Sequence, residues 1–223
     1  TSADTVIQIT GGGKLTAQQI LLNTCQTAIR TYGDIYIRKN SNKKETVFHT
    51  IGSTVSLTSE NGGVYSNEAR NGWQIVNTAL TVAAKSDVVI DRDLEITDSE
   101  ADITSTEGVF VVADTEEPGE DDDGESDCTI TGSRVGVQAA QNIAISHLDV
   151  SKNGNFNSYV TLKSVDGGYI GKTISLSESR LAIETAEDVL IRNEENASAN
   201  EPVVSVMSSK GTGSYRGTAS GEM

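Results

Sequence analysis

The chain is poor in aromatic residues and in proline. Aromatic side chains make up 4% of its 223 residues, Trp73 is the only tryptophan, and there are two prolines. Saccharide-binding grooves usually present tryptophan and tyrosine platforms, so this composition gives little indication of one. Ser, Thr and Gly are frequent instead. This profile is typical of a polar β-structure with many turns and argues against a helical enzyme.

Positive charge is also scarce. Lys and Arg number 17 against 32 Asp and Glu, which gives a formal net charge of −15, and the basic residues are scattered along the chain. A surface without a basic cluster cannot displace counterions from a phosphate backbone, so we expect no nucleic-acid partner. An acidic exterior is compatible with a secreted, salt-tolerant or colloidally stable particle.

Long apolar runs and a cysteine framework are missing from the sequence. No stretch approaches the roughly 18–20 apolar residues of a membrane span, so we expect none. The two cysteines, Cys25 and Cys128, are too few for a disulfide scaffold. We expect both thiols to be free or buried, with a single bridge between them as the alternative.

A repeat organises the second half of the chain. The stretches "SRVGVQAAQNIAI" (133–145) and "SRLAIETAEDVLI" (179–191) follow one pattern, and "LTVAAKSDVVI" (80–90) fits it as well. Each copy has alternating apolar residues, a corner of small residues, an Asp or Asn, and alternating apolar residues again. The alternation predicts strands with one buried face, and the Asx residue favours a turn.

A weaker copy, "YVTLKSVDGGYIG" (159–171), lies between the two strong ones. Counting it gives a period of about 23 residues, and short strands joined by corners at such a period predict a β-solenoid. Stacked coils of a solenoid pair as parallel sheets and bury one continuous apolar ladder.

The pattern resembles the right-handed parallel β-helix superfamily, which includes surface adhesins, phage tailspikes and pectate-lyase-like proteins. Asp87, Asn142 and Asp188 stand at one corner of the repeat and are similar to the Asn ladders of that fold. The resemblance covers approximately residues 80–210 and implies the fold alone, because no family's active-site motif is matched. The expected fold class is therefore all-β, a right-handed parallel β-helix.

The predicted organisation has three parts. Residues 1–33 are an N-terminal segment with an amphipathic cap helix over 15–32, since an open solenoid end needs a cover and six apolar residues stand close to helical spacing: Leu15, Ile20, Leu21, Cys25, Ala28 and Ile29. Residues 34–210 form the β-helix. Residues 211–223 form a tail rich in Gly and Ser.

The most charged run, "GEDDDGESD" (119–127), is the candidate metal site. Asp121, Asp123 and Glu125 could supply hard oxygen ligands to Ca²⁺. The run does not match the spacing of an EF-hand loop, and the alternative is a solvated loop at a widened corner. No other cofactor is expected.

Other chemistry-bearing residues form no recognisable motif. His49 and His147 alternate with apolar neighbours and lie beside no activated nucleophile. The glycines of "ITGGGKLTA" (9–17) lack the spacing of a phosphate-binding loop. Asp91 and Asp93 in "VVIDRDLEI" are expected to share an outward strand face, either as a solvated face or, with Arg92, as a pectate-lyase-like site.

We therefore expect a non-enzymatic structural or surface protein, such as an adhesin, fibre, filament subunit or virion decoration. It would be extracellular, on a cell surface or on a virion, and would form a homo-oligomer or larger assembly, with a surface glycan or receptor as a candidate partner. One alternative is a carbohydrate-active enzyme or tailspike-like depolymerase, for which five residues would converge in one cleft: Trp73, Asp91, Asp93, Glu95 and Asp149. Another is a calcium-stabilised binding module, for which chelation with EDTA would lower the melting temperature.

Overall fold

The computed structural model describes residues 5–38, 46–67, 71–113, 127–192, 203–208 and 213–216. These residues form 23 β-strands and no helix. Within this part of the chain, no helix has the length and apolar character needed to cross a membrane. The strands form two sheets, and the paired strands run parallel to each other. An all-β fold of parallel strands is therefore confirmed.

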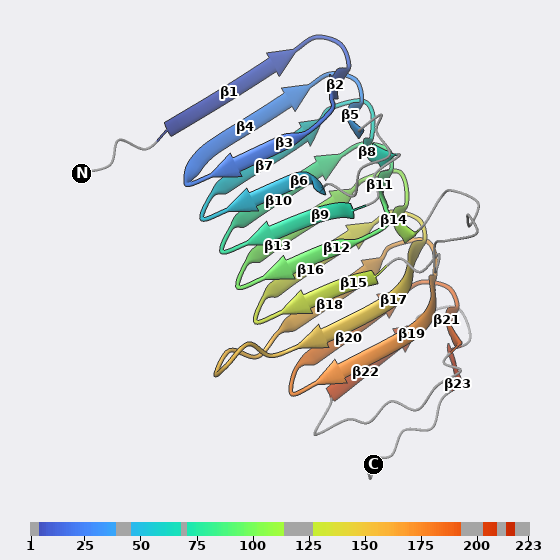
Figure 1. The fold of residues 1–223 in the computed structure, drawn as a ribbon. Coiled ribbons are helices and arrows are strands. Elements are labelled where there is room, and N and C mark those ends of the chain that lie inside the picture. Colours follow the sequence, from blue (N-terminus) through green and yellow to red (C-terminus); the bar gives the residue numbers. More distant parts are fainter. Residues whose placement is uncertain are drawn as a thin grey trace, which may run out of the picture.

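One sheet has nine strands that follow one another in chain order (Figure 1). They are β1 (Thr5–Gly11), β4 (Cys25–Thr31), β7 (Thr54–Ser59), β10 (Ala79–Ala84), β13 (Glu100–Ser105), β16 (Arg134–Ala139), β18 (Tyr159–Ser164), β20 (Arg180–Thr185) and β22 (Val203–Ser208). Figure 1 shows them stacked from β1 at the top to β22 at the bottom. We use the word layer for one of these strands together with the chain that follows it, up to the next such strand.

The other fourteen strands form the second sheet. They are β2 (Leu15–Ala17), β3 (Ile20–Asn23), β5 (Ile35–Arg38), β6 (Thr46–Ile51), β8 (Val64–Asn67), β9 (Asn71–Val76), β11 (Val88–Asp91), β12 (Leu94–Thr97), β14 (Phe110–Ala113), β15 (Asp127–Thr131), β17 (Ile143–Ser151), β19 (Tyr169–Ser177), β21 (Val189–Arg192) and β23 (Gly213–Arg216). Two short strands per layer give way to one long strand at β17, which pairs with both β14 and β15.

In strands such as β4, β10 and β16, alternate residues face a shared apolar core. Val137 pairs with Leu162, which pairs with Ile183, and all three are buried. Val137 and Ile183 therefore lie in one interior column, two layers apart, as the repeat predicts. The largest buried side chain, Trp73, packs against Phe48 with 4.7 Å between ring centroids.

The predicted cap helix over 15–32 is wrong, because β2, β3 and β4 occupy that range. The residues of β4 alternate between buried and exposed, and its buried positions include Thr27 and Thr31 as well as Cys25 and Ile29. Counting only apolar residues therefore skipped every second inward position and left a spacing of four, which imitates a helix. Thr and Ile are β-branched and favour strands.

A buried ladder, formed almost entirely by hydroxyl groups, runs along the corners that lead into seven of the nine strands, from β4 to β20. Its members are Cys25, Ser53, Thr78, Ser99, Ser133, Ser158 and Ser179. The backbone N–H of each member donates to the hydroxyl oxygen of the next, over 3.0–3.3 Å. The hydroxyl in turn donates to a backbone carbonyl, as Ser99 does to Thr97 over 2.6 Å. The ladder thus gives the buried N–H groups of six of these corners a hydrogen-bond acceptor.

Each corner has a characteristic backbone. The residue before a ladder member usually has a positive φ, as in Gly52, Asn77 and Asp98. Asn and Asp tolerate this left-handed conformation better than most residues, and Gly adopts it freely. Ladder members are 21 residues apart in the shortest layers and 34 apart between Ser99 and Ser133. The corner is therefore kept while the layer length varies.

A second contact joins the layers in pairs at the opposite end of the nine-stranded sheet. The side-chain oxygen Oδ1 of Asp87 accepts the N–H of Val109 in the next layer, and that of Asn142 accepts the N–H of Gly168. In the same layer pairs, Ser105 donates to the carbonyl of Ser86, and Ser164 to that of Gln141.

Glycine is required beside each of these Asx side chains. A Cβ atom on Gly108 would lie 2.2 Å from Oδ1 of Asp87, and one on Gly167 would lie 2.6 Å from Oδ1 of Asn142. Layers that carry an Asx residue therefore alternate with layers that carry a glycine. The repeating unit is two layers long, which explains why the clearest sequence copies skip a layer.

We predict that Ser99→Ala lowers the free energy of unfolding by about 1–3 kcal/mol, because it leaves the buried N–H of Thr78 without an acceptor. Ser99→Thr is the matched control, since Thr78 fills the equivalent ladder position and a threonine retains the hydroxyl. Urea denaturation of both variants measures the difference. Equal midpoints for the two variants would contradict the assigned role of the ladder.

Candidate functional site

The corner between β17 and β18 is longer than its counterparts. Elsewhere in the ladder a hydroxyl reaches the carbonyl two residues earlier, as in Ser133 to Thr131, whereas Ser158 reaches Ser151, seven residues earlier. The extra residues form a tight turn in which Asn153 and Phe156 exchange two backbone hydrogen bonds of 2.9 Å. Gly154 in this turn has a φ of 57°. We call residues 152–157 the inserted loop.

The inserted loop folds back across the neighbouring layers. The side-chain amide of Asn153 donates to both carboxylate oxygens of Asp98, over 2.9 and 2.8 Å, although the two residues are 55 positions apart. Gly132 lies between them, and a Cβ atom there would be 2.7 Å from Cβ of Asn153. The loop is thus held against the stack by a specific contact, and Gly132 leaves it the necessary space.

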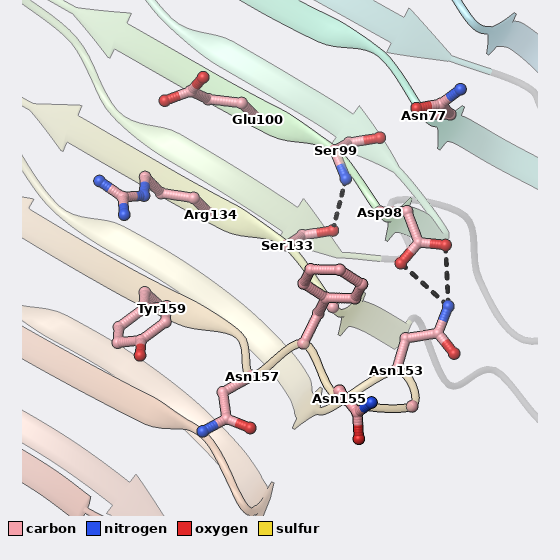
Figure 2. Close-up of a pocket in the computed structure, with 13 residues that line it drawn as sticks. Asn77, Asp98, Ser99, Glu100, Ser133, Arg134, Asn153, Asn155, Asn157 and Tyr159 are labelled. Carbon is pink, nitrogen blue, oxygen red and sulfur yellow. Dashed lines mark hydrogen bonds between the residues drawn. The ribbon is translucent and has the colours of Figure 1, made fainter.

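An open groove of about 1030 Å³ lies between the inserted loop and the first residues of β13, β16 and β18. Figure 2 shows the residues that line it. Its walls carry four asparagines, two carboxylates, one arginine and two aromatic rings: Asn77, Asn153, Asn155, Asn157, Asp98, Glu100, Arg134, Phe156 and Tyr159. Two ladder residues, Ser99 and Ser133, also line the groove, so the site is anchored on the most regular part of the scaffold.

The aromatic side chains of the groove face solvent. Phe156 is 71% exposed and Tyr159 is 43% exposed, in a chain with few aromatic residues. A large exposed ring at the tip of a tethered loop is a common feature of a contact surface, because burying it against a ligand is favourable. The sequence signal for this site was the unusual "KNGNFN" (152–157), which combines a turn-forming Asn-Gly pair with an isolated Phe.

Two arginines flank Tyr159 along the stack. Arg134, Tyr159 and Arg180 are consecutive register partners on β16, β18 and β20. The guanidinium carbons of Arg134 and Arg180 lie 5.9 and 5.7 Å from the centre of the tyrosine ring. Neither arginine forms an ion pair with a carboxylate of the described residues. The row therefore offers guanidinium donors to an external anion.

The groove is equipped for binding more clearly than for covalent chemistry. Asn side chains present both a donor and an acceptor, which suits hydroxyl groups, and a guanidinium suits a carboxylate. Neither histidine nor cysteine lines the groove. Asp98 already accepts two hydrogen bonds from Asn153, which ties its carboxylate to the loop.

The predicted calcium ligands Asp121, Asp123 and Glu125 lie outside the described residues. Within the described part of the chain, no group of three or more His, Cys, Asp or Glu side chains is arranged to hold a metal ion.

The five residues named for a carbohydrate-active cleft do not converge. Trp73 and Asp91 are buried, so the expectation of an outward face shared by Asp91 and Asp93 is wrong. Arg92 between them has a φ of 66° and turns the chain from β11 to β12. A corner replaces the continuous strand that the alternation of "VVIDRDLEI" indicated.

Three of the five residues do gather elsewhere, on the outer face of the second sheet. Glu95 pairs with Thr129, which pairs with Asp149, and the N–H of Asp127 donates to Asp93 over 3.2 Å. Burial raises the pKa of Asp149, and the charge of Asp127 raises it further. Burial also raises the pKa of Asp93, and the charges of Asp127 and Glu95 act in the same direction. We call Asp93, Glu95, Asp127 and Asp149 the acidic patch.

The histidines and cysteines lie outside the groove. His147 Nδ1 lies 2.5 Å from the hydroxyl of Thr173 on the neighbouring strand, and His49 lies on β6. Both cysteines are free and buried, which confirms that expectation. Cys25 begins the hydroxyl ladder, and burial raises the pKa of Cys128 to about 12, so its thiol stays protonated at neutral pH.

We predict that Asp149→Asn raises the melting temperature at pH 7. A carboxyl group whose pKa is higher in the folded protein favours folding when protonated, so its contribution is present at low pH and lost as pH rises through the raised pKa. The gain should be on the order of 1–3 °C, because exposed charges contribute under about 1 kcal/mol. It should shrink as the pH approaches 4, because more of the wild-type Asp149 carboxyl groups are then protonated.

Asp102→Asn is the control for this variant. Asp102 is exposed on β13 of the nine-stranded sheet, so its replacement removes one charge without relieving the acidic patch. Thermal melts of both variants across pH 4–7 separate the two effects. The same gain in both would show that total charge, and not the patch, is responsible.

Comparison with known proteins identifies no relative. No protein-family model, no curated protein and no solved structure matches the chain. The functional conclusion therefore depends on the geometry of the fold, the groove and the acidic patch.

Proposed function

We propose that this protein is a non-catalytic structural or surface protein, such as an adhesin, fibre, filament subunit or virion decoration. In this proposal its two sheets are the walls of a right-handed parallel β-helix. The hydroxyl ladder is the observation that carries the proposal, because it links successive layers from Cys25 to Ser179 by one repeated contact. Such a repeat favours a long rigid support.

The ends of the stack support assembly into a homo-oligomer or larger particle. Among the described strands, β1 pairs only with β4, and β22 pairs only with β20. Ile9 of β1 is 41% exposed although its register partner, Ile29, belongs to the core. Edge strands with unpaired backbone groups and uncovered apolar side chains readily accept another strand.

A second copy of the chain is the proposed occupant of this edge. If the β22 end of one copy stacks on the β1 end of the next, both parallel sheets continue across the junction. Such a contact joins two different surfaces, so it generates open filaments unless rotation closes a ring. An extracellular, cell-surface or virion location and a glycan or receptor partner belong to the same proposal.

A carbohydrate-active enzyme remains the second candidate. One observation favours it, namely that two carboxylates, Asp98 and Glu100, line the same groove as the aromatic rings. Paired carboxylates are the usual equipment of glycoside hydrolysis. The bonding of Asp98 to Asn153 favours a structural role for this carboxylate instead.

We predict that the protein associates end to end and that Ile9→Lys weakens this association at least tenfold, because it places a charge on the uncovered edge. Ile170→Lys is the matched control, since Ile170 is 52% exposed on β19 within the stack and away from β1. Light scattering over a range of concentrations, with electron microscopy of the same samples, measures the assembly. A wild-type protein that stays monomeric throughout would contradict the proposed assembly.

A further inference from the structure

We propose that the groove beside the inserted loop binds an acidic saccharide, with the carboxylate of the sugar held by Arg134 and the ring placed against Phe156. This inference deepens the proposed function, because it names the class of glycan that is bound, and it rests on that function in that the ligand is bound and not cleaved.

Arg134, Tyr159 and Arg180, which we call the arginine row, supply the positive charge beside the groove. Arg134 and Arg180 stand on either side of Tyr159 in register and form no ion pair with the described residues, in a chain of net charge −15. Glu100 is the register neighbour of Arg134 on β13, but no ion pair joins these two side chains in the described part of the chain. The guanidinium of Arg134 can therefore bind the carboxylate of a ligand through two parallel hydrogen bonds.

The remaining groups of the groove select a saccharide over a simple anion. Phe156 offers an exposed ring against which the C–H side of a sugar ring can pack, whereas the ring of Tyr159 lies between the two guanidiniums. Asn155 and Asn157 add amide groups that match hydroxyl groups as donors and acceptors. A bare phosphate or sulfate would leave all these groups unused.

The background charge excludes a strongly charged ligand. Asp98 and Glu100 line the same groove, so closely spaced anionic groups would meet repulsion there. A sugar with one carboxylate among several neutral hydroxyl groups satisfies Arg134 without this penalty. The inserted loop is held by the contact of Asn153 with Asp98, so the groove is largely formed before the ligand arrives.

Calorimetric titration of the full chain tests the inference with three probes. The probes are a uronate-containing oligosaccharide, the same oligosaccharide with its carboxyl groups reduced to alcohols, and inorganic phosphate. We expect the uronate to bind, and the reduced sugar and phosphate to bind at least tenfold more weakly. Binding of the reduced sugar as tightly as the uronate would overturn the role of the carboxylate. Equal binding of phosphate, or no binding of the uronate, would overturn the saccharide site.

Variants place the site on the groove. Arg134→Gln should weaken uronate binding by about tenfold to a hundredfold, since it removes a charge-assisted hydrogen-bonded pair. Phe156→Ala should weaken the binding of both sugars. Arg30→Gln is the matched control, because Arg30 lies on β4 of the same sheet and pairs with Glu60. An unchanged affinity in Arg134→Gln with an unchanged melting temperature would overturn the inference.

A reducing-end assay on the same mixtures separates this inference from the proposed function. Binding without new reducing ends supports both. New reducing ends would contradict the non-catalytic function while leaving the groove as the sugar site. Absence of binding, with end-to-end assembly intact, would remove the inference and leave the scaffold role standing.

Discussion

The rest of the structure depends on how the chain satisfies its backbone amides where it crosses from one sheet to the other. At these corners the hydrogen bonding between parallel strands is interrupted, and an N–H group buried there without a partner would cost about 1–3 kcal/mol. One hydroxyl group per layer solves the problem, because it accepts from the layer before and donates to a carbonyl of its own layer. Ser and Thr are small enough to fit inside the fold. Cys25 occupies the first position of the hydroxyl ladder, and its sulfur contacts the Ser53 hydroxyl more weakly than an oxygen would.

Hydrogen bonding of backbone amides also explains why the sequence repeats every two layers. An Asx side chain in one layer reaches the amide of the next layer, and that contact leaves no room for a Cβ atom at the facing position. The following layer must then carry glycine, and its serine returns a hydrogen bond to the layer before. Asx and glycine corners consequently alternate. The pairing makes two layers, and not one, the unit in which the sequence repeats.

The sequence was sufficient for the strands and the spacing of layers, because alternation of apolar residues is a local signal. It placed Val137 with Ile183, and it recognised Asp87 and Asn142 as equivalent corner residues. It failed where a polar residue is buried, as with Thr27 in the supposed cap helix, and where a positive φ breaks an apparently continuous strand at Arg92. The groove could not be predicted from the sequence, since the contact of Asn153 with Asp98 joins residues 55 positions apart.

The position of the inserted loop connects the scaffold to its proposed use. Extra residues at a corner disturb no strand register, so long as the hydroxyl ladder resumes afterwards, and Ser158 resumes it by bonding both neighbouring layers. The loop is then tethered to Asp98, while the floor of the groove includes the ladder residues Ser99 and Ser133. A site with a floor made from the most constrained part of the stack loses little conformational entropy on binding. In the proposed function, the regular layers hold the inserted loop in place, and the longer corner between β17 and β18 supplies residues of the groove.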